Sequence, residues 1–113
     1  MPLVCGPRYR EVMADVLGAA VVDDAASRSG PFFTSEVPAL DAWTFDPAVD
    51  RPVVLVQGAD SPPPLHRLIA HLAALLPQAT VETVQNADHL MPLTVPATLA
   101  ALISRAADRV VVA

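Results

Sequence analysis

The segment from residue 53 to residue 85 constrains the fold most strongly, because two strand-like runs flank a helix-like run. Residues 53–57 form an unbroken, mostly β-branched apolar run, which is typical of a strand buried on both faces of a parallel sheet. Residues 65–76 place leucine and isoleucine at helical spacing, with Arg67 and His71 on the opposite face. Residues 80–85 alternate as an edge-near strand does. We therefore predict a βαβ unit and the α/β class.

The flanking segments predict further helices. Residues 8–20 carry one apolar helical stripe that Gly18 weakens, and residues 21–30 suit either a continuing helix or a loop. Ser35 is expected to cap a short helix that holds Pro38 in its first turn. A last helix is expected from Pro96, with a buried stripe of four residues and a tail, residues 110–113, that is either a short strand or a frayed end. The stripe comprises Leu99, Leu102, Ile103 and Ala106.

Composition excludes several classes of protein. The net charge of -5 without any lysine argues against nucleic acid as a partner. A single cysteine, Cys5, excludes an internal disulfide and fits a reducing compartment, so we expect a cytoplasmic protein. Polar residues or proline interrupt every apolar run, and residues 1–8 lack the pattern of a secretory signal, so no membrane association is expected. His66 and His71, five apart, are expected to face solvent and hold no metal.

The aromatic residues concentrate between residues 31 and 45, where Phe32, Phe33, Phe45 and Trp43 occur. Such a cluster usually covers the core of a domain. The alternative is that Phe32, Phe33 and Trp43 form a wall of a substrate-binding site.

Two loops are expected at the edge of the sheet where parallel strands end, which is where ligands bind in α/β proteins. Residues 58–64 offer Asp60 and Ser61, and residues 86–93 offer Asp88 and His89. A carboxylate and an imidazole on neighbouring strands can meet across the strand spacing of about 4.8 Å. A histidine oriented by an acid can act as a general base near neutral pH.

These residues resemble an α/β-hydrolase. Residues 52–62, residues 76–96 and the helix that follows are similar to that family's last two strands, so the resemblance covers about residues 52–107. Residues 32–45 resemble, more weakly, the region between lid and final strands. The resemblance implies a partial α/β-hydrolase fold: a helical lid-like or connecting segment over residues 1–51, and a C-terminal βαβα portion over residues 52–113. The portion would hold a small parallel sheet of two main strands with flanking helices.

The resemblance also implies roles for individual residues. His89 would be the general base and Asp60 its orienting acid, in a serine hydrolase that cleaves a small hydrophobic ester-like substrate without a cofactor. Each residue has a simpler alternative: His89 bonds locally as most lone histidines do, and the Asp60 carboxylate caps the next helix. Asp88 is expected to be an ordinary loop carboxylate.

The sequence departs from the family's pattern at three places. Family members often carry glycines just before the histidine, where this chain has Asn86 and Asp88. Many place the acid three residues after the strand-ending glycine, where this chain has Ser61. No serine lies within a G-x-S-x-G elbow, so no residue qualifies as the nucleophile. The serines are Ser27, Ser29, Ser35, Ser61 and Ser104.

Three functions remain open at this stage. The chain contributes the histidine to a hydrolase whose nucleophile elbow comes from a complementing chain, or it is a non-catalytic hydrolase-like module that binds or forms homo-oligomers. A third interpretation is an unrelated βαβ domain that binds an anion at a helix N-terminus. The lack of a glycine-rich phosphate loop in the sequence argues against the third.

Overall fold

The computed structural model describes residues 5–112, with side chains for residues 5–110. The described chain divides into two compact units. One unit is Arg10–Pro47, and the other joins the residues up to Tyr9 to those from Ala48 onward. Within residues 5–112, no helix has the length and apolar content needed to cross a membrane.

The unit of residues 10–47 is helical. Its elements are α2 (Tyr9–Leu17), α3 (Ala19–Ser27), the π-helical turn η1 (Phe32–Glu36) and α4 (Val37–Ala42). Gly18 separates α2 from α3 with a φ of 91°, a left-handed conformation that glycine adopts without steric cost. Residues 21–30, for which either a helix or a loop was expected, are helical as far as Ser27. Pro38 lies in the first turn of α4 as predicted, but the N-cap is Glu36, so the predicted Ser35 cap is wrong.

Three of the four aromatic side chains of this unit are exposed, and Phe45 is half-buried. Phe32, Phe33 and Trp43 expose 40%, 58% and 65% of their surface, respectively. They pack mainly on their own neighbours, with Phe32 edge-to-face on Phe33 and Trp43 edge-to-face on Phe45. These aromatic residues therefore form no buried cluster within their own unit, and the expectation that they cover the core stays a prediction.

The other unit is a βαβ unit followed by two helices. Strand β1 (Val53–Gly58) is followed by α5 (Pro63–Leu75), β2 (Ala79–Val84), the short α6 (Met91–Thr94) and α7 (Pro96–Val112). Among the described residues, β1 and β2 form a two-stranded parallel sheet, in register from Val53 opposite Ala79 to Gly58 opposite Val84. The prediction of a mixed α/β fold with a parallel sheet is confirmed.

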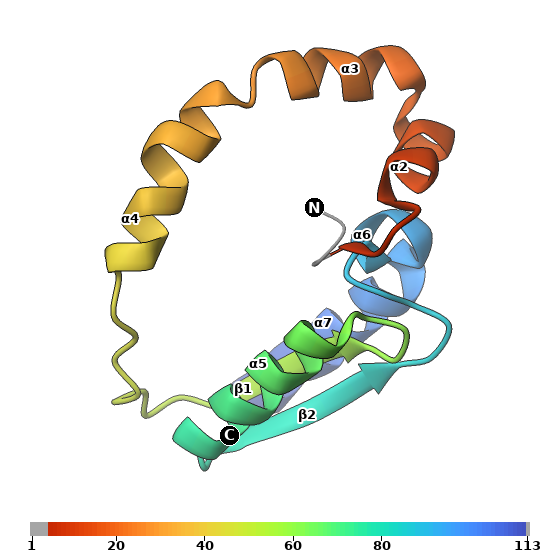
Figure 1. Ribbon diagram of the computed structural model, residues 1–113. Coiled ribbons are helices and arrows are strands. Elements are labelled where there is room, and N and C mark those ends of the chain that lie inside the picture. The colour runs from red at the N-terminus through yellow and green to blue at the C-terminus, as the bar shows by residue number, and fades with distance from the viewer. Residues whose placement is uncertain (1–4, 113) are drawn as a thin grey trace. The chain divides into compact units, whose positions relative to one another are not determined.

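Helices α5 and α7 lie on opposite faces of this sheet (Figure 1). Gln57 of β1 bonds to His66 of α5, whereas the preceding residue, Val56, packs against the cluster that contains Leu102 of α7. Adjacent strand residues point to opposite faces, so these two contacts assign one helix to each face. Both strands are nevertheless mostly half-buried or exposed, so the prediction that the first strand is fully buried on both faces is wrong.

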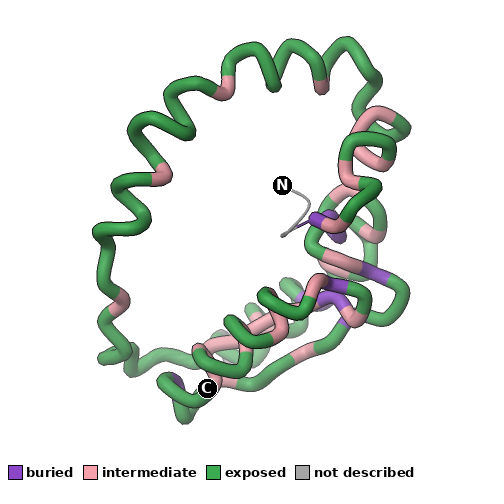
Figure 2. Tube along the Cα trace, in the orientation of Figure 1, coloured by how far each residue is buried: buried purple, intermediate pink, exposed green. Residues whose placement is uncertain are grey.

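The core gathers at the carboxyl ends of the strands (Figure 2). Its buried members are Val84, Ala87, Met91 and Leu102, with Val56, Val95 and Leu99 partly buried against them. Two expectations for the last helix are corrected here. Ile103 is 60% exposed and not part of the buried stripe, and the helix continues to Val112 where a strand or frayed end was expected, with Ala113 outside the described residues.

Gly58 ends β1 at the point where the second loop crosses it. A Cβ atom built on Gly58 would lie 2.7 Å from the Cα of Asp88 and would overlap the carbonyl of Ala87. Both contacts are with backbone, which cannot rotate away as a side chain can. The absence of a side chain at residue 58 therefore allows the two loops to meet.

We predict that Gly58→Ala lowers the free energy of unfolding by about 2 kcal/mol or more, because the new methyl group displaces the backbone of residues 87–88. Gly30→Ala is the control, since a Cβ at Gly30 meets nothing within 4 Å. Urea unfolding of the two variants checks the prediction. Equal stability of Gly58→Ala and the unmodified chain would contradict the close approach.

Candidate functional site

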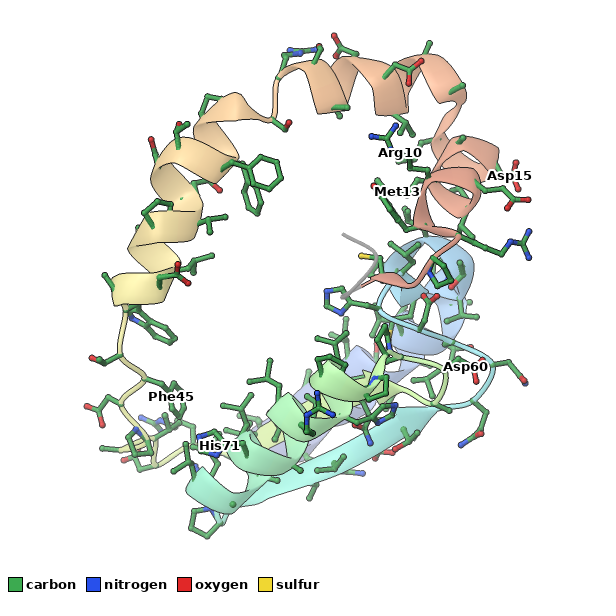
Figure 3. All side chains as sticks on the ribbon, viewed as in Figure 1. Arg10, Met13, Asp15, Phe45, Asp60 and His71 are labelled. Carbon is green, nitrogen blue, oxygen red and sulfur yellow. The ribbon has the colours of Figure 1, made fainter. Side chains whose placement is uncertain are left out.

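The loops that follow β1 and β2 are in direct contact at one edge of the sheet. The amide of Ala59 donates to the carbonyl of Val84 at 2.9 Å, and the amide of Asp60 donates to the carbonyl of Ala87 at 2.9 Å. Asp60 thus lies on the rim beyond β1, at the opposite end of the unit from His71 (Figure 3). The predicted arrangement, in which parallel strands bring both loops to a common rim, is confirmed.

The second loop obtains its shape without glycine. Asn86 adopts a φ of 55°, the left-handed region that asparagine tolerates better than most residues. Two residues later, a carboxylate oxygen of Asp88 accepts a hydrogen bond of 2.7 Å from the amide of Leu90. Asn86 and Asp88 therefore shape this turn, and Asp88 has a structural role that the sequence analysis did not assign.

His89 lies at a small cavity on this rim. It lines a space of about 110 Å³ together with Gly58, Ser61 and Met91, among others. His89 itself is exposed, whereas Ser61 is only 8% exposed. An imidazole at the mouth of a cavity can exchange protons with a bound group and with solvent.

Asp60 occupies a different environment. Its side chain is exposed, and it is not among the described residues that line the cavity of His89. Ser61, three residues after Gly58, faces that cavity instead. The alternative role of Asp60 as a cap lacks support, because the N-cap of α5 is Pro62 and no side-chain hydrogen bond caps the helix.

A polar cluster that the sequence analysis missed joins α5 to the sheet. Gln57 Nε2 donates to Thr83 Oγ1 at 3.1 Å, and His66 Nδ1 bonds to Gln57 Oε1 at 3.1 Å. His66 is consequently half-buried, so the expectation that it faces solvent is wrong, whereas His71 is exposed as expected. The signal for this cluster was Gln57, the one polar side chain in β1, which follows its four apolar residues.

Cys5 lies close to the second loop. Its thiol is buried, and burial raises the pKa of Cys5, with a further increase from the nearby Asp88 carboxylate. A raised pKa keeps the sulfur protonated and poorly nucleophilic at neutral pH.

The remaining candidate ligands are dispersed. Within the described residues, no group of three or more His, Cys, Asp or Glu side chains could hold a metal ion.

Phe32, Phe33 and Trp43 belong to the unit of residues 10–47. Trp43 lines an open hollow of about 510 Å³ there, with Glu36, Ala39 and Leu40.

Two substitutions of Asp88 separate its charge from its hydrogen bond. Asp88→Asn keeps an acceptor for the Leu90 amide but removes the negative charge, so the pKa of Cys5 should fall while stability changes little. Asp88→Ala removes both and should also lower the free energy of unfolding by about 1 kcal/mol. A titration of thiolate ultraviolet absorbance and urea unfolding measure the two effects. An unchanged thiol pKa in Asp88→Asn would show that the carboxylate does not act on Cys5.

Comparisons of this chain with protein-family models, curated proteins and solved structures found no match. The interpretation of the rim therefore rests on its residues and geometry. Those are a histidine at a small cavity, an acid on the adjoining loop and a backbone contact that holds the two loops together.

Proposed function

We propose that this chain carries the histidine of an α/β-hydrolase-like active site and contributes it to the cleavage of a small hydrophobic ester-like substrate. The observation that supports this most strongly is the hydrogen bond between the Asp60 amide and the Ala87 carbonyl. It joins the acid-bearing loop to the histidine-bearing loop at the edge of a parallel sheet, where α/β enzymes bind substrates.

In this proposal His89 acts as the general base. It accepts the proton of a serine hydroxyl as that oxygen attacks the ester carbonyl, and it returns the proton to the leaving alcohol. A carboxylate that bonds to the second ring nitrogen would hold the ring in place and stabilise the imidazolium. Asp60 is the nearest candidate by position in the loop, and an acid from outside these residues is the alternative.

The serine and the amides that stabilise the oxyanion would have to come from another segment or another chain. The 113 residues contain no G-x-S-x-G elbow. Complementation by a polypeptide with such an elbow would supply both, because one oxyanion-hole amide follows the nucleophile in this kind of site. We further propose that Phe32, Phe33 and Trp43 provide apolar contacts for the substrate, and that the protein acts in the cytoplasm.

The alternative proposal is a non-catalytic hydrolase-like module that binds a partner or forms homo-oligomers. It is favoured by the exposed position of the Asp60 side chain and by the small volume of the cavity beside His89, about 110 Å³. Hydrolysis assays distinguish the two proposals.

We predict that the chain alone is not labelled by a fluorophosphonate serine probe, because it lacks an activated serine. When a polypeptide that carries a G-x-S-x-G elbow and complements this chain is supplied, p-nitrophenyl esters should be hydrolysed. His89→Ala should then lower kcat/KM by at least about 1,000-fold, because the serine loses its base.

The matched control is His71→Ala, which removes an exposed imidazole at the far end of α5 and should leave turnover unchanged. Turnover that survives His89→Ala would remove His89 from the site. Failure of every ester to react in the complemented protein would favour the non-catalytic module.

A further inference from the structure

A second surface of the same unit lies along the edge of β1 that faces away from β2. A groove of about 490 Å³ lies beside this edge on the face of the sheet that α7 covers, and Gln78 and Thr80 at the start of β2 line it together with β1 and α7. Val53, Val54 and Val56 form one wall, and Ile103, Ala107 and Val110 of α7 contribute to the other. Ile103 and Val110 are 60% and 56% exposed, although they belong to the helix that packs on the sheet.

The backbone of β1 is available for pairing along the free edge beside this groove. In the part of the chain that the structure describes, β1 pairs with β2 along one edge and with no strand along the other. Its six residues, Val-Val-Leu-Val-Gln-Gly, include neither a charge nor a proline, and its register with β2 is continuous. Charged residues, prolines and bulges are the features by which proteins normally protect a strand edge, so an edge without them favours strand addition.

We propose that the occupant of this groove is a second copy of the chain, joined by antiparallel pairing of β1 with β1 about a two-fold axis. Such an axis, perpendicular to the sheet, keeps both α7 helices on one face and both α5 helices on the other. The product is a four-stranded sheet covered on both faces, which removes the exposed β1 edge from both copies.

The spacing of the helices fits this arrangement. Helix α7 lies over both strands, since it lines one hollow with Val54 of β1 and Glu82 of β2. If each α7 lies midway over its own two strands, the two α7 axes in the four-stranded sheet are two strand spacings of about 4.8 Å apart. The resulting separation of about 10 Å is close to the usual distance between packed helices. Ile103, Ala107 and Val110 would then lie between the two helices, and the small alanine permits their close approach.

Charge favours a second copy at this surface more than elsewhere. The chain carries a net charge of -5, so two copies repel each other over much of their surface. Among the described residues that line the groove there is no acid, and Arg109 is the one charged side chain. Two copies can therefore meet here without bringing acidic groups together.

The interface is of modest size. A strand edge of six residues is about 20 Å long, and a sheet with a helix layer on each face is about 30 Å thick, so each copy would bury about 600 Å². The total of about 1,200 Å² lies at the lower limit for specific interfaces. We therefore expect a dimer that dissociates on dilution. This inference does not rest on hydrolytic activity.

Sedimentation velocity of the 113-residue chain over a range of concentrations tests the proposal. The unmodified chain should change from monomer to dimer as concentration rises. Ile103→Arg should raise the dimer dissociation constant at least about 10-fold, because it places a charge in the apolar seam of both copies. The control is Ser104→Arg, which adds the same charge at the next, exposed residue and should leave the dimer intact.

Circular dichroism shows whether each variant is folded, and Val110→Arg replaces Ile103→Arg if the latter is not. Hydrogen exchange provides the second measurement: amides of residues 53–58 should become more protected as the dimer forms. The proposal is overturned by a chain that stays monomeric at all concentrations, as it would if another segment or protein covers β1. A dimer that both groove variants leave unchanged, or growth beyond a dimer, would overturn it equally.

Discussion

The backbone of Ala87 lies directly against Gly58, and much of this unit depends on that contact. The contact is possible because residue 58 has no side chain, and it is completed by the bonds from the Ala59 and Asp60 amides to the second loop. Because the two strands are parallel and paired in register, their carboxyl ends reach this point together. The buried core, the cavity of His89 and the turn that begins α5 all lie around it. A change in this contact would therefore move the candidate site and the core together.

The packing of the sheet is uneven along its length. Buried side chains from β2, the second loop, α6 and α7 cluster at the carboxyl end, whereas the amino-terminal half of β1 borders an open groove. A small unit buries a limited fraction of its surface, so each exposed apolar group takes a larger share of a small net stability. Among the described residues, the same sheet thus has a packed rim at one end and an unpaired strand edge along one side.

The histidine and the acid of the rim lie in different surroundings. His89 is placed at a cavity with access to solvent, as a general base requires, but the inward-facing neighbour is Ser61 and the Asp60 carboxylate is exposed. Asp88 is engaged by the amide of Leu90 and acts electrostatically on Cys5. The Asp88 carboxylate therefore holds the backbone of the second loop, and the activation of a nucleophile would require groups from beyond these residues.

The sequence by itself determined the elements whose pattern is local. The apolar run of β1, the leucine spacing of α5, the alternation of β2 and the proline that begins α7 each specify one element through steric and burial preferences within a few residues, and parallel pairing followed from their order. Only the tertiary structure decided which side chains those elements bury. The helical spacing of Ile103 suits a core as well as an open groove, and the loop position of Asp60 does not reveal that Ser61 points inward. Burial depends on what lies opposite a residue in space, and here the opposing surface comes from residues distant in the sequence.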